Sequence, residues 1–207
     1  MIKKSEVNPY PFTYPSRHIR RHGPTGYRNY ESYRDWLRDE FSFRCVFCLR
    51  REQWGLVGNA WNIDHFTPQS RVPQGILQYE NLLYVCGTCN SLKSAHLVPD
   101  PGTVAFVESL RITDDGSIQA LDDNGKLLIQ VLRLDNEDHT RFRSLILRTL
   151  RVLAVKDWAT FVLWMGYPTD IPDLSKLRPP EGNTRRDGIN SSFFARRSRA
   201  ELEETYE

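Results

Sequence analysis

Apolar positions change their spacing along the chain, and each change predicts a different element. Between residues 30 and 41, apolar side chains recur at the spacing of one helix face, which predicts an amphipathic helix. Short apolar runs at 61–66 and 81–85 suit two brief strands, and residues 90–96 have the composition of a short helix. The predicted order at the centre of the chain is therefore strand, loop, strand, helix.

The segment from 102 to 165 has a different pattern. Turn signals at Asp115–Gly116 and Asn124–Gly125 separate three short apolar segments, which predicts a small antiparallel β-meander. A helical pattern then begins after Asn136, a predicted N-cap, and continues to about residue 165. Together with the central elements, this pattern predicts an α+β fold.

The two ends of the chain lack a sustained period. Residues 1–29 are rich in Pro and Tyr and predict an extended arm, whereas residues 166–207 are rich in Pro, Arg and Ser and predict a flexible tail. Residues 1–30 carry six Lys or Arg and one Glu, about +5, although the whole chain carries only +2. Such arms could contact phosphates, dock a partner protein or do neither, and the expected domain is 30–165.

Composition limits the class of protein. Apolar residues make up 40% of the 207 positions, which allows a buried core and excludes global disorder. No apolar run approaches the roughly 18 to 20 residues that a membrane helix needs, and the start of the sequence lacks a signal-peptide core. We therefore expect a cytoplasmic protein that makes no membrane contact.

All four cysteines fall into two Cys-x-x-Cys pairs, Cys45/Cys48 and Cys86/Cys89. Each pair presents two sulfurs to one ion, and two pairs complete a tetrahedral shell with no open position. This spacing predicts a structural Zn²⁺ site with a long insertion between the pairs. Free buried thiols and a thiol redox pair are the alternative interpretations.

The insertion contains Asp64 and His65 in succession. A carboxylate suits a hard divalent cation, and an imidazole suits proton transfer near neutral pH. Neighbouring side chains on a strand point to opposite faces, so joint action requires the backbone to bend here. The following Pro68 makes a bend plausible.

The sequence resembles the HNH endonuclease family, in which a ββα finger holds one catalytic metal and zinc knuckles often bracket the motif. The matching residues, in the family order, are Cys45-x-x-Cys48, Asp64-His65, Asn81-Leu82 and Cys86-x-x-Cys89-Asn90-x-x-Lys93. They span about 41–98, less than a third of the chain. The expected fold is thus a ββα-metal finger with a four-cysteine zinc site, flanked by an N-terminal helix and, over 102–165, the meander and long helix.

The resemblance implies roles for individual residues. It implies that His65 is the general base, that Asp64 and Asn90 bind a catalytic ion, and that Asn81 holds the loop that orients His65. Many family members have histidine in place of Asn90, and the oxygen-rich alternative favours Mg²⁺ or Mn²⁺. The loop at 69–75 also lacks the glycine pair common in the family.

Two cations near this motif are candidates for substrate binding. Lys93, one turn after Asn90, and Arg71, in the loop, are predicted to contact phosphates, with a solvated surface position as the alternative for each. The main hypothesis is a metal-dependent endonuclease that hydrolyses phosphodiester bonds, with DNA expected from the resemblance alone. The alternative is a catalytically silent, zinc-stabilised nucleic-acid-binding module.

Overall fold

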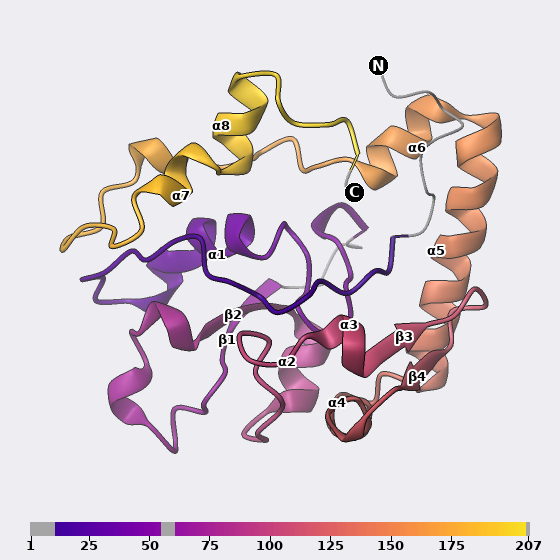
Figure 1. The fold of residues 1–207 in the computed structure, drawn as a ribbon, viewed down its shortest axis with the longest axis horizontal. Helices are drawn as coiled ribbons and strands as arrows, with labels where there is room; N and C mark the ends of the chain where they lie inside the picture. The colour runs from indigo at the N-terminus through magenta and orange to yellow at the C-terminus, as the bar shows by residue number, and fades with distance from the viewer. Residues whose placement is uncertain (1–10, 55–60, 206–207) are drawn as a thin grey trace.

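The computed structural model describes residues 11–54 and 61–205, and all elements below belong to these ranges (Figure 1). The α-helices are α1 (Arg34–Glu40), α2 (Gly87–Lys93), α3 (Phe106–Ser109), α4 (Asp123–Leu132), α5 (Glu137–Lys156), α6 (Trp158–Met165), α7 (Asp187–Asn190) and α8 (Phe193–Ser198). The strands are β1 (Trp61–His65), β2 (Leu82–Cys86), β3 (Leu110–Ile112) and β4 (Ile118–Ala120). Short 3₁₀ helices are η1 (Tyr30–Tyr33), η2 (Glu52–Trp54), η3 (Pro73–Gly75), η4 (Tyr79–Asn81) and η5 (Leu174–Lys176). The mixture confirms the predicted α+β class.

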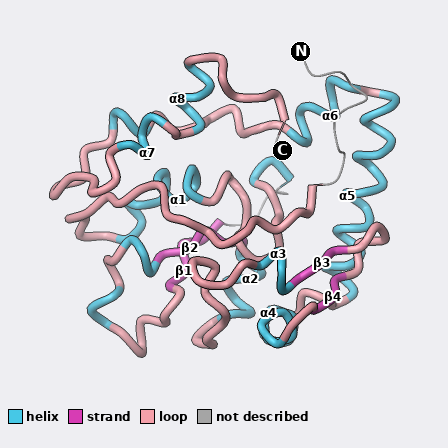
Figure 2. Tube along the Cα trace, in the orientation of Figure 1, coloured by secondary structure: helices cyan, strands magenta, loops and turns pink. Residues whose placement is uncertain are grey.

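Strands β1 and β2 form an antiparallel hairpin that lies between α1 and α2 (Figures 1 and 2). The register pairs Trp61 with Cys86 and His65 with Leu82. All of β2 is buried, because helices pack against it, and Cys86 is at once its last residue and the N-cap of α2. The predicted order of strand, loop, strand and helix is confirmed, with the helix beginning three residues earlier than expected.

The predicted meander is correct for its first two strands, which are the hairpin β3–β4, and wrong for the third, which is helix α4. Asp122 caps this helix by accepting a hydrogen bond from Gly125 N at 2.7 Å, and Leu128 and Leu132 are buried one turn apart. A Cβ atom at Gly125 would lie 2.0 Å from the carbonyl oxygen of Ser109. The glycine therefore permits close packing of a helix, although its sequence context resembles a turn.

The predicted long helix is divided in two. Asn136 is the N-cap of α5 as expected, since its side chain accepts a hydrogen bond from His139 N at 2.8 Å. Asp157, with φ −147° and ψ 85°, interrupts the helix and caps α6 through Thr160 N. None of the helices in the described ranges is both long and apolar enough to cross a membrane.

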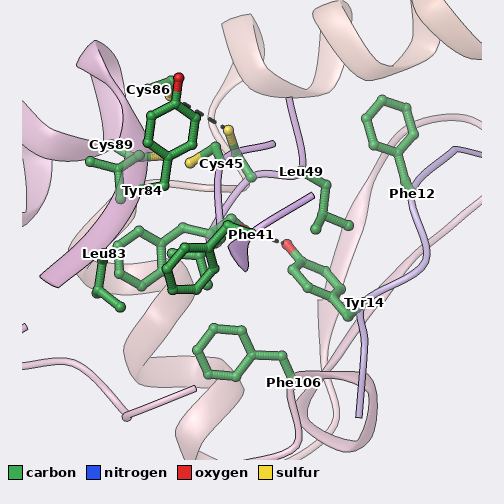
Figure 3. Packing of buried hydrophobic residues seen from close by; sticks show 14 of the residues in the cluster. Phe12, Tyr14, Phe41, Cys45, Leu49, Leu83, Tyr84, Cys86, Cys89 and Phe106 are labelled. Atoms are coloured by element: carbon green, nitrogen blue, oxygen red, sulfur yellow. Dashed lines mark hydrogen bonds between the residues drawn. The ribbon is translucent and has the colours of Figure 1, made fainter. Parts of the chain in front are cut away.

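The described part of the predicted N-terminal arm packs into the core (Figure 3). Phe12 meets Trp54 edge to face with ring centroids 5.6 Å apart, and the Tyr14 hydroxyl donates to the carbonyl oxygen of Phe47 at 2.7 Å. Both arm residues are buried. The first ten residues of the arm lie outside the described residues.

The segment after α6 contains more packed structure than its composition predicts. It includes α7 and α8, and Ile171 and Phe193 form a small apolar cluster with Phe43. An isolated antiparallel bridge joins Asn183 to Pro24, so the two terminal segments lie side by side. Figure 1 shows this segment running across the molecule above α1.

Candidate functional site

The four cysteines meet at one point, although 38 positions separate Cys48 from Cys86. Cys45 and Cys48 lie in the turn after α1, whereas Cys86 and Cys89 lie at the start of α2. All four sulfur atoms are buried within 4.8 Å of one another, and those of Cys48 and Cys86 are 3.6 Å apart. Figure 3 shows Cys45, Cys86 and Cys89 of this cluster close together. Four sulfurs bound to a tetrahedral zinc at about 2.3 Å stand about 3.8 Å apart. The cluster therefore has the size and donor set of a zinc site.

Backbone contacts place the first cysteine pair against the hairpin. Val46 N donates to the carbonyl oxygen of Tyr84 at 3.2 Å, and Leu49 N closes a tight turn onto Cys45 O at 3.0 Å. Leu49 has φ +59°, a left-handed conformation that such a turn requires. Hydrogen bonds from the other three cysteines lower the pKa of Cys86, whereas burial raises the pKa of Cys45 and the neighbouring thiols raise the pKa of Cys89.

His65 lies at the end of β1 and is 6% exposed. Its Nε2 atom is 3.0 Å from the carbonyl oxygen of Ile76, and its Nδ1 atom is 3.1 Å from the side-chain nitrogen of Gln69. A carbonyl oxygen can only accept, so the proton belongs on Nε2 and the lone pair on Nδ1. The Tyr30 ring meets the imidazole edge to face, with centroids 5.1 Å apart. The Ile76 carbonyl thus favours the tautomer that carries its proton on Nε2.

Asp64 points to the α2 side of the strand, where Lys93 is fully buried. Lys93 Nζ lies 2.9 Å from Asp64 Oδ2 and donates to the carbonyl oxygen of His65 at 2.8 Å. Burial raises the pKa of Asp64, and the neighbouring ammonium of Lys93 opposes this shift. The interpretation of Lys93 as a solvated surface cation is wrong, because the lysine closes a buried ion pair with the motif acid.

Asn81 joins the two ends of the loop between the strands. Its Oδ1 accepts from Thr67 N at 2.7 Å, and its Nδ2 donates to the carbonyl oxygens of Thr67 and Gly75 at 3.1 and 3.2 Å. Its own carbonyl oxygen accepts from Phe66 N at 2.8 Å. Asn81 therefore fixes the chain directly after His65.

The two remaining candidates lie on different elements, Asn90 on α2 and Arg71 in the loop between β1 and β2. Asn90 is half-buried on α2, one turn before Lys93. Arg71 is exposed on a turn whose backbone is closed by a hydrogen bond from Arg71 N to Pro68 O at 2.9 Å. The arginine side chain is therefore available to solvent.

The HNH endonuclease family model matches residues 45–96. This range contains both cysteine pairs, the β1–β2 hairpin with its loop, and α2. Residues 45–96 form an HNH domain. The resemblance drawn from the sequence is confirmed over this range, and no curated protein matches the chain.

Part of the basic cluster of the predicted arm contacts α1 and the start of β2. Arg21 and His22 both lie 2.9 Å from Asp39 Oδ1 on α1. Arg20 donates to the carbonyl oxygen of Leu82 at 2.6 Å, at the first residue of β2. Arg20 and Arg21, two of the six basic residues counted in this segment, thus have acceptors within the molecule.

Sequence reasoning missed two groups of the HNH domain, the Gln69 amide and the Ile76 carbonyl, which together surround the imidazole of His65. No periodicity or motif marks either one. Their positions depend on how the loop folds back over the end of β1, and a backbone carbonyl carries no sequence signal at all.

Proposed function

We propose that this protein is a metal-dependent endonuclease that hydrolyses phosphodiester bonds of nucleic acid, with DNA as its substrate and His65 as general base. The observation that carries the proposal is the tautomer of His65. Its Nε2–H group faces the Ile76 carbonyl at 3.0 Å, so its Nδ1 atom has the lone pair that a general base needs. The HNH match over residues 45–96 supports the same reaction class.

In the proposed reaction, Nδ1 of His65 accepts a proton from water, and the oxygen attacks phosphorus in line with the departing oxygen. The bond from phosphorus to that oxygen breaks, and solvent supplies its proton. General-base assistance of this kind contributes about 10² to 10⁴ in rate. Asn81 serves the reaction indirectly, because its three side-chain hydrogen bonds hold the loop that follows His65.

Asp64 and Asn90 are the residues that we propose to hold the catalytic Mg²⁺ or Mn²⁺. A carboxylate and an amide oxygen form a hard donor set, and Oδ2 of Asp64 is buried without an aligned hydrogen bond. When bound, the ion would offset negative charge on the phosphate and on the departing oxygen. Lys93, at 2.9 Å from the same oxygen, has to share the carboxylate with the ion or move from it.

The two candidate cations, Arg71 and Lys93, have different proposed roles. Arg71 is exposed on the loop and is our candidate for a phosphate contact. Lys93 is fully buried and bonded to Asp64 and to the His65 carbonyl, and we assign it a positioning role. Its ammonium orients the acid and the end of β1.

One observation favours the second candidate function, a silent zinc-stabilised nucleic-acid-binding module. A buried lysine already neutralises Asp64, as expected if no metal ion ever binds there. The tautomer of His65 favours the endonuclease, because a binding module has no need of a fixed Nδ1 lone pair.

The test is nicking of supercoiled plasmid by purified, zinc-loaded protein with Mg²⁺ or Mn²⁺, alongside EDTA. His65→Ala is the decisive variant, and His96→Ala is its matched control, because His96 is an exposed histidine of the same domain. We expect metal-dependent nicking that is lost in His65→Ala and kept in His96→Ala. If the folded protein cleaves neither plasmid, linear DNA nor RNA, the result would instead support the catalytically silent binding module.

A further inference from the structure

An arginine of the N-terminal segment lies near the candidate base without an internal partner. Arg28 is exposed, and within the described ranges it forms no hydrogen bond or ion pair. Two residues later, the Tyr30 ring meets the imidazole of His65 edge to face, with ring centroids 5.1 Å apart. Two residues span at most about 7 Å of backbone. Arg28 therefore lies beside a residue that contacts the candidate base.

The 3₁₀ helix η1, which begins two residues after Arg28, is attached to the loop of the HNH domain. The Tyr33 hydroxyl donates to the carbonyl oxygen of Leu77 at 3.0 Å, in the loop that also supplies the carbonyl bonded to His65. Asn29 caps the helix by accepting a hydrogen bond from Glu31 N at 3.0 Å. The chain that follows Arg28 is therefore held against the loop.

The chain before Arg28 turns against the segment that follows α6. Gly26 has φ +86°, and a Cβ atom there would lie 2.7 Å from the backbone nitrogen of Glu181. Thr25 N donates to the carbonyl oxygen of Gly182 at 2.9 Å, and Glu181 N donates to that of Thr25 at 3.2 Å. Arg28 thus projects from a backbone that is anchored on both sides, which lowers the ordering cost of a contact with a ligand.

Two acids near η1 are paired with other cations. Glu31 Oε2 accepts from Arg34 Nε at 3.0 Å, and Glu80 pairs with Arg185 at 3.0 Å. Among the residues that the structure describes, no carboxylate forms an ion pair with Arg28. An exposed guanidinium can bind a phosphate through two parallel hydrogen bonds without first breaking an internal pair. The charge of Arg28 is therefore available to an anionic ligand.

We propose that Arg28 contacts a phosphate that flanks the scissile phosphate, so that a residue outside the HNH domain helps to hold the nucleic acid. This inference rests on the proposed function, in which His65 marks the position of the scissile phosphate. Arg28 precedes η1, whereas Arg71 lies in the loop after β1, so two separate segments supply cations beside the candidate base. Such contacts add affinity and fix the register of the substrate without reading its sequence.

The first experiment measures DNA binding without cleavage. Fluorescence anisotropy of a labelled DNA duplex, without added Mg²⁺ or Mn²⁺, gives the Kd at several salt concentrations. We expect Arg28→Gln to raise the Kd about tenfold, since a charge-assisted hydrogen bond is lost. The slope of log Kd against log salt should fall by about one, because one phosphate contact fewer releases counterions. Arg28→Lys keeps the charge and should retain the slope.

Arg17→Gln is the matched control. Arg17 is another exposed arginine of the N-terminal segment, and it lines a cavity with Pro101 and Phe106 that no residue of η1 lines. Its Kd and salt slope should match those of the wild type. An unchanged Kd in Arg28→Gln, or equal losses in the two variants, overturns the proposed contact.

The second experiment relates the contact to the cleaved bond. In a duplex whose nicking position has been mapped, a neutral methylphosphonate at one flanking phosphate should weaken binding by the wild type about tenfold and leave binding by Arg28→Gln unchanged. Equal sensitivity of the two proteins at every flanking phosphate overturns the proposal. If wild type and His65→Ala are equally inactive, the proposed function fails, and the Kd and salt slope of Arg28→Gln still decide whether Arg28 binds a phosphate.

Discussion

Lys93 Nζ lies 2.9 Å from Oδ2 of Asp64, with the lysine fully buried and the aspartate 8% exposed. The lysine also donates to the carbonyl oxygen of the next residue, His65, at 2.8 Å. One ammonium group on α2 therefore holds both the acid and the backbone of the candidate base. The pair ties the last two residues of β1 to the helix that follows β2.

Lys93→Met should destabilise the protein by about 3–5 kcal/mol, because it leaves a carboxylate buried without its cation. The double variant Asp64→Asn, Lys93→Met should recover part of this loss, since the uncompensated charge is gone. Urea unfolding at neutral pH measures both values. Lys126→Met, at the exposed pair with Asp123, is the matched control and should change little. Equal stability of Lys93→Met and wild type would show that the buried pair does not form.

Removal of one zinc ligand should unfold the centre of the protein. The cluster joins the turn after α1 to α2, and zinc binding of this kind contributes on the order of 10 kcal/mol or more to folding. Cys89→Ser should lose bound zinc and cooperative thermal unfolding, as measured by elemental analysis and circular dichroism. Thr88→Ala alters an exposed neighbour and should keep both. Retention of one tightly bound zinc by Cys89→Ser would contradict the four-cysteine site.

Asn81→Ala should lower the rate of nicking while the protein remains folded. The variant loses the three side-chain hydrogen bonds that close the loop after His65, and small displacements of a reacting group cost up to about 10²-fold in rate. Steady-state nicking rates should fall by about 10- to 100-fold, beside a Gln78→Ala control on the same loop. A change in affinity for DNA with an unaltered maximal rate would argue against a positioning role.

Acid should weaken the contact between the N-terminal segment and α1. Burial tends to raise the pKa of Glu40, but the His18 contact, the Arg20 charge and the backbone N–H of Arg21 outweigh it and lower the pKa to about 2. A carboxyl with a lowered folded pKa contributes stability above its unfolded pKa near 4.5, and that contribution disappears as the pH falls toward 2.

The melting temperature should therefore drop between about pH 4.5 and pH 2, and it should drop less in Glu40→Gln. Thermal unfolding monitored by tryptophan fluorescence measures this difference. Glu108→Gln, an exposed acid, is a suitable control. Parallel pH profiles for wild type and Glu40→Gln would contradict the lowered pKa.

The sequence determined the features that depend on local chemistry. Two Cys-x-x-Cys pairs predict a zinc cluster because each pair forms its own knuckle, and the structure brings the four sulfurs together. Asn136 predicts a helix start because capping involves only the next few residues, and it caps α5. The ββα order likewise follows from short apolar runs, each of which reports its own strand or helix.

Only the tertiary structure decided the features that depend on residues far apart in the sequence. Asn124–Gly125 resembles a turn in sequence, but Gly125 serves the close approach of α4 to Ser109. Lysine is usually exposed, and Lys93 is buried only because β1 places an acid and a carbonyl opposite α2. Gln69 reaches His65 only because the loop folds back over the strand end. Burial and pairing are properties of the assembled core, so periodicity along the chain cannot specify them.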